Sequence, residues 1–247
     1  MAKQIWTAVV GGVVAAGCAP GPAVRPLVTD RPDFTESTAT VEPGRVQVEG
    51  GYTYADEEGG TSHSVGELLG RIGATERLEV RVGLNSVGFV DAGGTSEVGV
   101  EDASLGVKLA LVGGDALAAA VLAGTTIPTG RSPLGGESAV PSVVLALSRG
   151  VGAIGWGGNV VAEWPEDGAG ERYTDLGASL AAGVGLTDRT GLFLEVYGFR
   201  SPGRSGSGRL YLDGGLTRML REDLQVDARV GGGEGGWFVG VGLARRW

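Results

Sequence analysis

From residue 44 to the C-terminus, apolar and polar residues alternate with a period of two. One segment places Leu78, Val80 and Val82 at alternate positions, with charged or polar residues between them. Because successive side chains of a β-strand point to opposite faces, this period predicts strands with one apolar and one polar face. We delimit twelve such segments: 44–56, 63–73, 77–90, 100–112, 116–127, 139–149, 154–164, 173–185, 190–200, 209–220, 223–231 and 236–247.

The connections between these segments alternate in length. Short turns, such as those at 73–76, 113–115 and 150–152, alternate with longer polar loops, such as 91–99, 128–138 and 165–172. Strands of about ten residues, with short turns at one end and long loops at the other, are typical of bacterial outer-membrane barrels. The sequence therefore predicts an all-β fold, a transmembrane antiparallel up-and-down β-barrel of about 12 strands over residues 44–247.

A soluble β-sandwich also has alternating strands and frequent turns. Two features favour the membrane barrel instead. The polar face carries charges of both signs at mid-strand, as the wall of a lumen would. The chain also ends with apolar residues at alternate positions, and its last residue is aromatic: Trp237, Val239, Val241, Leu243 and Trp247.

Composition excludes some partners and supports the barrel. The 48 glycines among 247 residues follow no collagen-like period, and glycine within strands marks bends and close backbone approach. The net charge of −9 and the absence of Lys/Arg clusters argue against nucleic acid as a partner. We expect outer-membrane lipid and a small-molecule solute as partners.

The N-terminus resembles an export signal. Residues 1–19 combine Lys3 with an apolar run that is too short for a membrane span, and we interpret them as a signal peptide. Cys18, the single cysteine, follows small residues and is a candidate for lipidation. The alternative is ordinary cleavage near Ala19, which would remove Cys18.

Residues 29–54, TDRPDFTESTATVEPGRVQVEGGYTY, are the most specific stretch of the chain. They resemble the opening of the outer-membrane transporter family labelled MetA-pathway of phenol degradation. Further matches are Leu69, Arg71 and Gly73 with the following TERLE motif, Lys108, and the Pro-Thr-Gly motif at 128–130. The resemblance covers nearly the whole chain after the signal peptide. It implies a role in moving aromatic or other small compounds.

Residues 20–43 form an N-terminal segment that lies in the periplasm or inside the lumen. Its charged members cannot face lipid, where an unpaired charge is very costly. One hypothesis is that Asp30, Asp33 and Glu36 pair with the wall residues Arg71, Arg77 and Arg81 at the mouth of the barrel; the alternative is a solvated linker. The candidate residues of this segment are Asp30, Arg31, Asp33, Phe34 and Glu36.

The polar face offers candidate residues for a solute path. Aromatic and acidic side chains share one face of the strands at 190–200 and 209–220, where they could stack a planar solute and bind its polar edge. Equally, these side chains could pack together and close the barrel. The expected lumen residues are Arg71, Arg77, Glu79, Arg81, Lys108, Glu195, Tyr197, Tyr211 and Asp213.

The sequence gives little support for an enzyme. The one histidine, His63, has serine neighbours whose side chains would point to the opposite face of a strand. No metal-ligand spacing and no phosphate-binding loop are present, so we expect no catalytic residue, no metal and no cofactor. We expect passive passage of small solutes, aromatic compounds among them. The alternatives are a closed anchoring barrel and, as a third reading, an outer-membrane enzyme.

Overall fold

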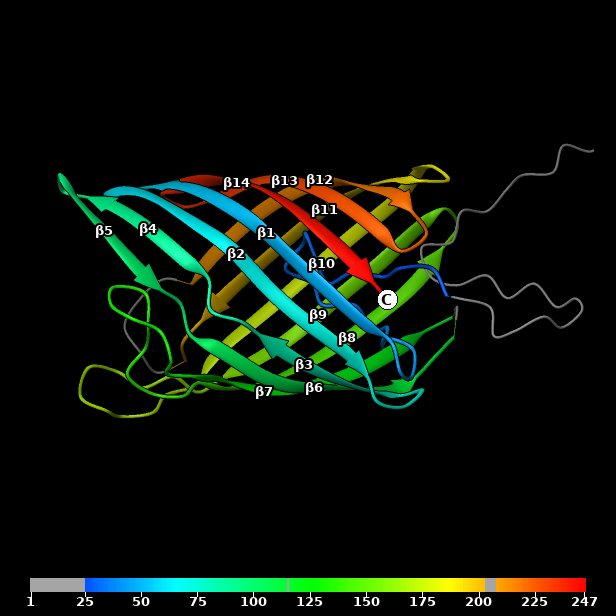
Figure 1. Cartoon of the computed structure of the whole chain (residues 1–247), viewed down its shortest axis with the longest axis horizontal. Coiled ribbons are helices and arrows are strands. Elements are labelled where there is room, and N and C mark those ends of the chain that lie inside the picture. Colours follow the sequence, from blue (N-terminus) through cyan, green and yellow to red (C-terminus); the bar gives the residue numbers. More distant parts are fainter. Residues whose placement is uncertain (1–24, 115, 203–207) are drawn as a thin grey trace, which may run out of the picture.

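The computed structural model describes residues 25–114, 116–202 and 208–247, which form one closed antiparallel β-barrel (Figure 1). Its strands are β1 (Val46–Glu57), β2 (Gly60–Gly73), β3 (Leu78–Gly83), β4 (Val87–Ala92), β5 (Thr95–Val100), β6 (Ala103–Val112), β7 (Ala118–Ile127), β8 (Pro141–Val151), β9 (Ile154–Glu163), β10 (Asp175–Thr187), β11 (Thr190–Arg200), β12 (Arg209–Arg221), β13 (Leu224–Gly233) and β14 (Gly236–Arg246).

The fourteen strands fill twelve positions around the ring, and we call each position a stave. β3 and β4 lie end to end in the third stave, and β5 and β6 lie end to end in the fourth. β2 pairs with β3 at one end and with β4 at the other, and β3 and β4 pair in turn with β6 and β5. β1 closes the barrel by pairing with both β2 and β14. The predicted twelve-strand, up-and-down antiparallel barrel is confirmed.

The interruptions in the third and fourth staves were not predicted. The break between β3 and β4 lies beside a bulge in β2, where Gly66 and Glu67 have φ angles of 106° and 42° and the β1–β2 register shifts. The break between β5 and β6 lies one strand further around the ring. Backbone hydrogen bonds still cross the gap, from the Leu84 N–H to the Leu68 carbonyl and from the Glu101 N–H to the Ser86 carbonyl. A bulge bends its strand and disrupts the ladder locally, which accounts for the breaks in the neighbouring staves.

The outer wall is apolar and the inner wall is polar, as the alternation predicts. On β6, Leu105 and Leu109 are 49% and 43% exposed on the outer face, whereas Lys108 on the inner face is fully buried. On β14, Trp237, Val239 and Val241 all face outward. Most large hydrophobic side chains of the described strands therefore cover the outside of the barrel, as they do in membrane-spanning barrels.

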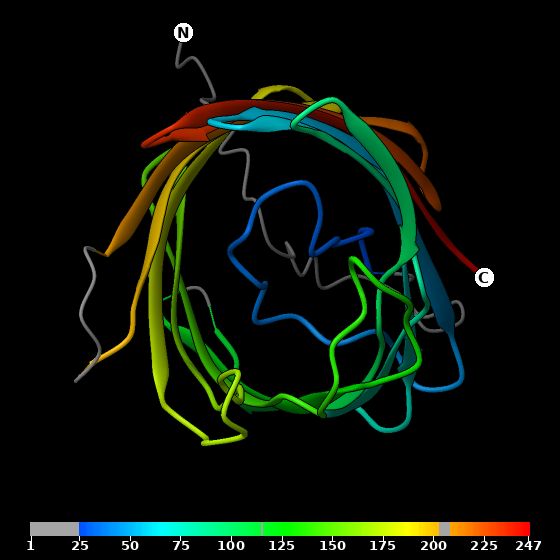
Figure 2. The same cartoon turned by 90° about the vertical axis from the view of Figure 1, so that its left-hand side faces the viewer.

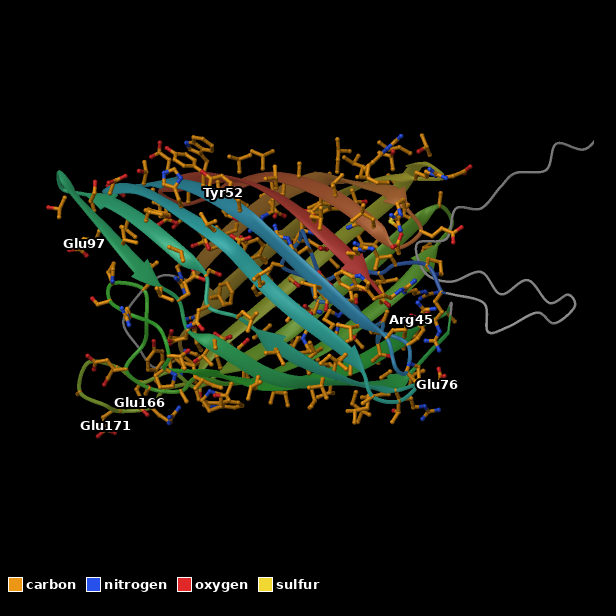
Figure 3. All side chains as sticks on the ribbon, in the orientation of Figure 1. Arg45, Tyr52, Glu76, Glu97, Glu166 and Glu171 are labelled. Carbon is orange, nitrogen blue, oxygen red and sulfur yellow. The ribbon has the colours of Figure 1, made fainter. Side chains whose placement is uncertain are left out.

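The two ends of the barrel differ. β1 begins and β14 ends at the end that carries the short turns, where Figure 3 shows Arg45 and Glu76. Glu97, Glu166 and Glu171 lie at the opposite end with the long loops (Figure 3). We call these the short-turn end and the long-loop end. No helix in the described part of the chain is long and apolar enough to cross a membrane.

The lumen is occupied by chain that belongs to no strand. Most of the segment at 25–44 runs inside the ring of strands, as the end-on view in Figure 2 shows, and both of its ends are exposed at the short-turn end. The loop at 128–138 also folds inward from the long-loop end (Figure 2), and Leu134 packs against Gly88 of β4 and Gly99 of β5. A Cβ on either glycine would lie 2.0 or 3.0 Å from a Leu134 carbon, so these glycines make room for the loop.

Candidate functional site: the occupied lumen

An ion cluster around Asp30 ties the N-terminal segment to one side of the barrel. The Asp30 carboxylate accepts hydrogen bonds from Lys108 Nζ of β6 at 2.8 and 3.0 Å and from Arg81 of β3. Its Oδ2 also lies 3.2 Å from Nη1 of Arg71 on β2. One carboxylate from the segment therefore contacts three cations that project from three adjacent strands.

Two wall carboxylates complete this cluster. Arg71 donates two hydrogen bonds to Glu79, at 2.9 and 3.0 Å, and one to Glu49 at 2.9 Å. Glu49 and Glu79 also accept backbone N–H groups of the segment, those of Asp30 and Val41 among them. Arg71, Glu49 and Glu79 are completely buried. Buried charges are stable only when they are paired and hydrogen-bonded, and here the segment supplies part of that pairing.

Arg31 extends along a different part of the wall. Its Nη1 donates to Glu67 at 2.6 Å, and its Nη2 lies 3.8 Å from Asp227. The guanidinium lies against Gly51 and Gly242, which face each other across β1 and β14. A Cβ at either glycine would come within 2.5 Å of an Arg31 nitrogen, so glycine at both positions leaves room for the Arg31 guanidinium. The bulge in β2 directs Glu67 toward Arg31.

The next residues of the segment contact the opposite side of the barrel. The Phe34 N–H donates to Glu195 of β11 at 2.6 Å, and the Glu36 N–H donates to Asn159 of β9 at 2.7 Å. The hydroxyls of Thr35 and of Ser179 on β10 are 2.7 Å apart. Because β2, β3 and β6 lie across the ring from β9, β10 and β11, the segment spans the lumen from wall to wall.

Two acids of the segment have raised pKa values. Burial, together with the nearby Asp30, raises the pKa of Glu36 to about 7, although Arg81 binds its two oxygens at 2.9 Å each. Burial and the neighbouring Glu195 raise the pKa of Asp33 well above its usual value. By contrast, the surrounding cations lower the pKa of Asp30, outweighing the burial that opposes them. Asp30 is therefore held in its ionised form.

Aromatic rings continue from the segment toward the long-loop end. Phe34 stacks on Tyr197, with ring centres 4.7 Å apart, and Tyr197 stacks on Tyr211 at 5.0 Å. Phe199 meets both Phe34 and Tyr197 edge-on. The stack leads to a cavity of about 260 Å³, which we call the outer chamber. Its lining residues are Thr53, Ala55, Glu57, Tyr197, Phe199, Arg209, Tyr211, Arg229 and Phe238.

Most of the expected lumen residues are on the inner wall: Arg71, Glu79, Arg81, Lys108, Glu195, Tyr197, Tyr211 and Asp213. Arg77 is an exception, because it lies exposed in the turn before β3 and not in the lumen. Asp33 is partly buried in the lumen, and no described residue forms an ion pair with it at 4.0 Å or less. The pairing of the segment with Arg71 and Arg81 thus involves Asp30 and Glu36 only.

Three features of this site do not follow from the alternation of residues along the chain. Lys108 was expected in the lumen but not as the partner of Asp30. The contacts of Arg31 with Glu67 and the inward loop at 128–138 were also not foreseen. The one sequence signal for the Arg31 contact was glycine at inward positions of β1 and β14. Cys18 and the expected signal peptide lie outside the described residues.

The described residues contain no group of three or more His, Cys, Asp or Glu side chains that could hold a metal ion. Comparison with curated proteins found no match.

Solved structures with a similar fold are porins and an autotransporter domain. The NanC porin superposes with a TM-score of 0.56 at 11% identity, over 81% of this chain and 98% of that one. The KdgM porin superposes with a TM-score of 0.55 at 8% identity, over 80% of this chain and 98% of that one. The translocator domain of the autotransporter NalP from Neisseria meningitidis superposes with a TM-score of 0.55 at 14% identity, over 82% of this chain and 88% of that one. At such identities the likeness concerns the fold, which is that of an outer-membrane, porin-like barrel.

The sequence itself matches one family profile, described as "Putative MetA-pathway of phenol degradation", over residues 29–246. This match begins at the lumen segment, includes all the strands and extends to the end of β14. The chain therefore belongs to the MetA-pathway of phenol degradation family.

Proposed function

We propose that this barrel is a passive channel for small solutes, aromatic compounds among them, and that the segment at 25–44 is its plug. The observation that carries this proposal is the continuous stack of Tyr211, Tyr197 and Phe34, which leads from the outer chamber to the plug. Stacked rings offer flat apolar faces, and the carboxylates of Glu195 and Asp213 on the same inner wall accept hydrogen bonds. A planar solute could use both as it moves inward.

The manner in which the plug is held supports a movable element. The described plug residues form no strand. Most of their contacts with the wall involve a side chain, and the Gly44 N–H at the end of the plug donates to the Gly73 carbonyl of β2. Release of the plug would therefore leave every stave hydrogen-bonded to its neighbours. Among the structures with this fold, the KdgM porin was solved in complex with a disordered oligogalacturonate, which supports passage of a small solute through a barrel of this size.

A closed barrel without transport is the second candidate, and the ion cluster around Asp30 favours it. Breaking a buried ion pair by removing one partner costs about 3–5 kcal/mol. A plug held by several such contacts could remain docked under all conditions. The two functions differ in a single property, which is whether solute crosses the barrel.

Proteoliposome swelling with methyl glucoside and phenyl glucoside separates these functions. The two solutes share a sugar and differ in the aromatic ring. We expect wild-type protein to admit both solutes faster than protein-free liposomes do. The Asp30→Asn variant, whose plug is less firmly held, should admit both faster still. Swelling at the protein-free rate for both proteins would contradict the channel and support the closed barrel.

A comparison of the two solutes tests the aromatic stack. Replacing Tyr211 with Leu removes one stacking face and leaves the plug contacts unchanged. We expect this Y211L variant to lose part of its phenyl glucoside rate and to keep its methyl glucoside rate. Equal losses for both solutes would show that the ring of Tyr211 does not guide aromatic solutes.

A further inference from the structure

The outer chamber combines flat rings with positive charge. Tyr197 and Tyr211 stack with their planes 13° apart, and Phe199 stands nearly perpendicular to Tyr197, at 84°. The chamber volume, about 260 Å³, lies just below the range of about 300–1,000 Å³ that is usual for drug-sized ligands. It therefore suits a molecule with a single ring.

Two arginines face this chamber with weak partners. The Arg229 guanidinium lies 5.0 Å from the centre of the Phe238 ring, and its hydrogen bond to Thr53 is long, at 3.4 Å. Its Nε is buried and has no hydrogen-bond partner. Arg209 lies 5.6 Å from the Phe199 ring and 3.9 Å from the Asp175 carboxylate. Asp213 and Asp227 lie near enough to act on Arg229 electrostatically, but neither forms an ion pair with it at 4.0 Å or less. The terminal N–H groups of both arginines can therefore still donate to a ligand.

The lining is positively charged overall, because its charged members are Arg209, Arg229 and one acid, Glu57. The backbone around it is shaped to hold Arg229 and the stacked rings. A Cβ at Gly240 would lie 3.2 Å from Arg229 Nε, and one at Gly233 would lie 2.7 Å from a ring carbon of Tyr211. Glycine at these two positions lets both side chains lie close to the wall.

We infer that the outer chamber binds a single-ring aromatic carboxylate. The ring of the ligand packs against Tyr211 and Phe238, and its carboxylate accepts hydrogen bonds from the guanidinium of Arg229. Guanidinium matches carboxylate geometry through parallel N–H donors, and such charge-assisted bonds are roughly twice as strong as neutral ones. This inference deepens the proposed passage of aromatic solutes by naming a solute class, and it rests on that proposal. Binding itself can be measured without any passage.

The test is calorimetric titration of the refolded full chain in detergent with four probes. Benzoate has the ring and the charge, phenol has the ring alone, cyclohexanecarboxylate has the charge without aromaticity, and acetate has the charge without a ring. We expect benzoate to bind at least tenfold more tightly than each of the others. This ranking is measured on the wild-type protein, so it does not depend on whether any variant folds.

Variants then locate the site. Arg229→Gln should weaken benzoate binding by about 10- to 100-fold, the range for loss of a hydrogen bond to a charged group. The control is Arg218→Gln on the same strand as Tyr211, at an exposed outward position away from the chamber, where Arg218 donates to Thr190; it should leave benzoate affinity unchanged. Tyr211→Leu provides a second variant at the chamber and should weaken benzoate more than acetate.

Three results would overturn the inference: no benzoate binding at millimolar concentration, equal affinity for benzoate and phenol, or unchanged benzoate affinity in a folded R229Q protein. If benzoate binds as expected but neither glucoside crosses liposomes, the chamber is a binding site and the channel proposal fails. If the glucosides cross but benzoate does not bind, the channel stands and the ligand assignment fails.

Discussion

Asp30→Asn is the substitution that should loosen the plug most, because Asp30 is shared by three wall cations. Its carboxylate lies 2.8 Å from Lys108 Nζ and 3.2 Å from Arg71 Nη1, and it also bonds Arg81. Removing one partner of a buried ion pair costs about 3–5 kcal/mol. Each 1.4 kcal/mol is a tenfold change in an equilibrium constant, so the undocked population should rise by about 100- to 5,000-fold.

Hydrogen–deuterium exchange reads this population directly. In the docked plug, the N–H groups of Asp30, Phe34 and Glu36 bond to wall side chains, so their exchange requires the plug to move. We expect D30N to speed exchange in residues 29–41 by about 100-fold or more, while the strands keep wild-type protection. The Asn side chain can keep some of the hydrogen bonds, which places the expected effect toward the lower end of the range.

Asp33→Asn is the matched control, since it makes the same chemical change three residues away. No described cation pairs with Asp33, and its neighbour Glu195 is also acidic. We expect D33N to leave the plug as protected as in wild type, or more so. Wild-type exchange in D30N, or faster exchange in D33N than in D30N, would refute the view that the ion cluster holds the plug.

Three further predictions concern the plug and the outer wall. Burial raises the pKa of Glu36 to about 7 from 4.5, so its contribution to docking is fully present below about pH 4.5 and is lost as pH rises through 7. Hydrogen–deuterium exchange of the plug, corrected for intrinsic rates, should therefore be faster at pH 8 than at pH 5.5, and this difference should be smaller in Glu36→Gln. Gly242→Ala should displace Arg31 and speed plug exchange, because the new Cβ would lie 2.5 Å from Arg31 Nε, whereas Gly183→Ala, whose nearest atom would be 3.7 Å away, should not. Leu105→Lys on the lipid-facing wall should lower barrel stability in bilayers by about 2–4 kcal/mol, measured by urea titration, and unchanged stability would contradict the assigned facing.

The alternation of residues was enough to predict the strands, because in a barrel each strand has one lipid face and one lumen face. The outward positions of β6 and β14 follow from this period alone. The breaks in the third and fourth staves do not, since they depend on the bulge at Gly66 and Glu67 in a neighbouring strand. A period describes one strand at a time and contains no information on how the ladder continues around the ring.

The lumen was predictable in its residue types and less so in its pairings. Alternation places Arg71, Arg81 and Lys108 on the inner wall, but it does not give their positions around the ring or their depth. The contact between Asp30 and Lys108 joins residues 78 positions apart and depends on how the staves are staggered. Arg77 was misplaced because the alternating pattern continues one residue beyond the strand, which begins at Leu78.

The central property proposed for this barrel is that its plug blocks the lumen and opens it by moving. A disulfide between residues 35 and 179 tests this claim, because the hydroxyls of Thr35 and Ser179 are 2.7 Å apart and their Cβ atoms are then close to the distance that a disulfide needs. In the T35C/S179C protein, with Cys18 replaced by Ser, we predict a low single-channel conductance when oxidised and a wild-type conductance after reduction. The same conductance before and after reduction would contradict the account.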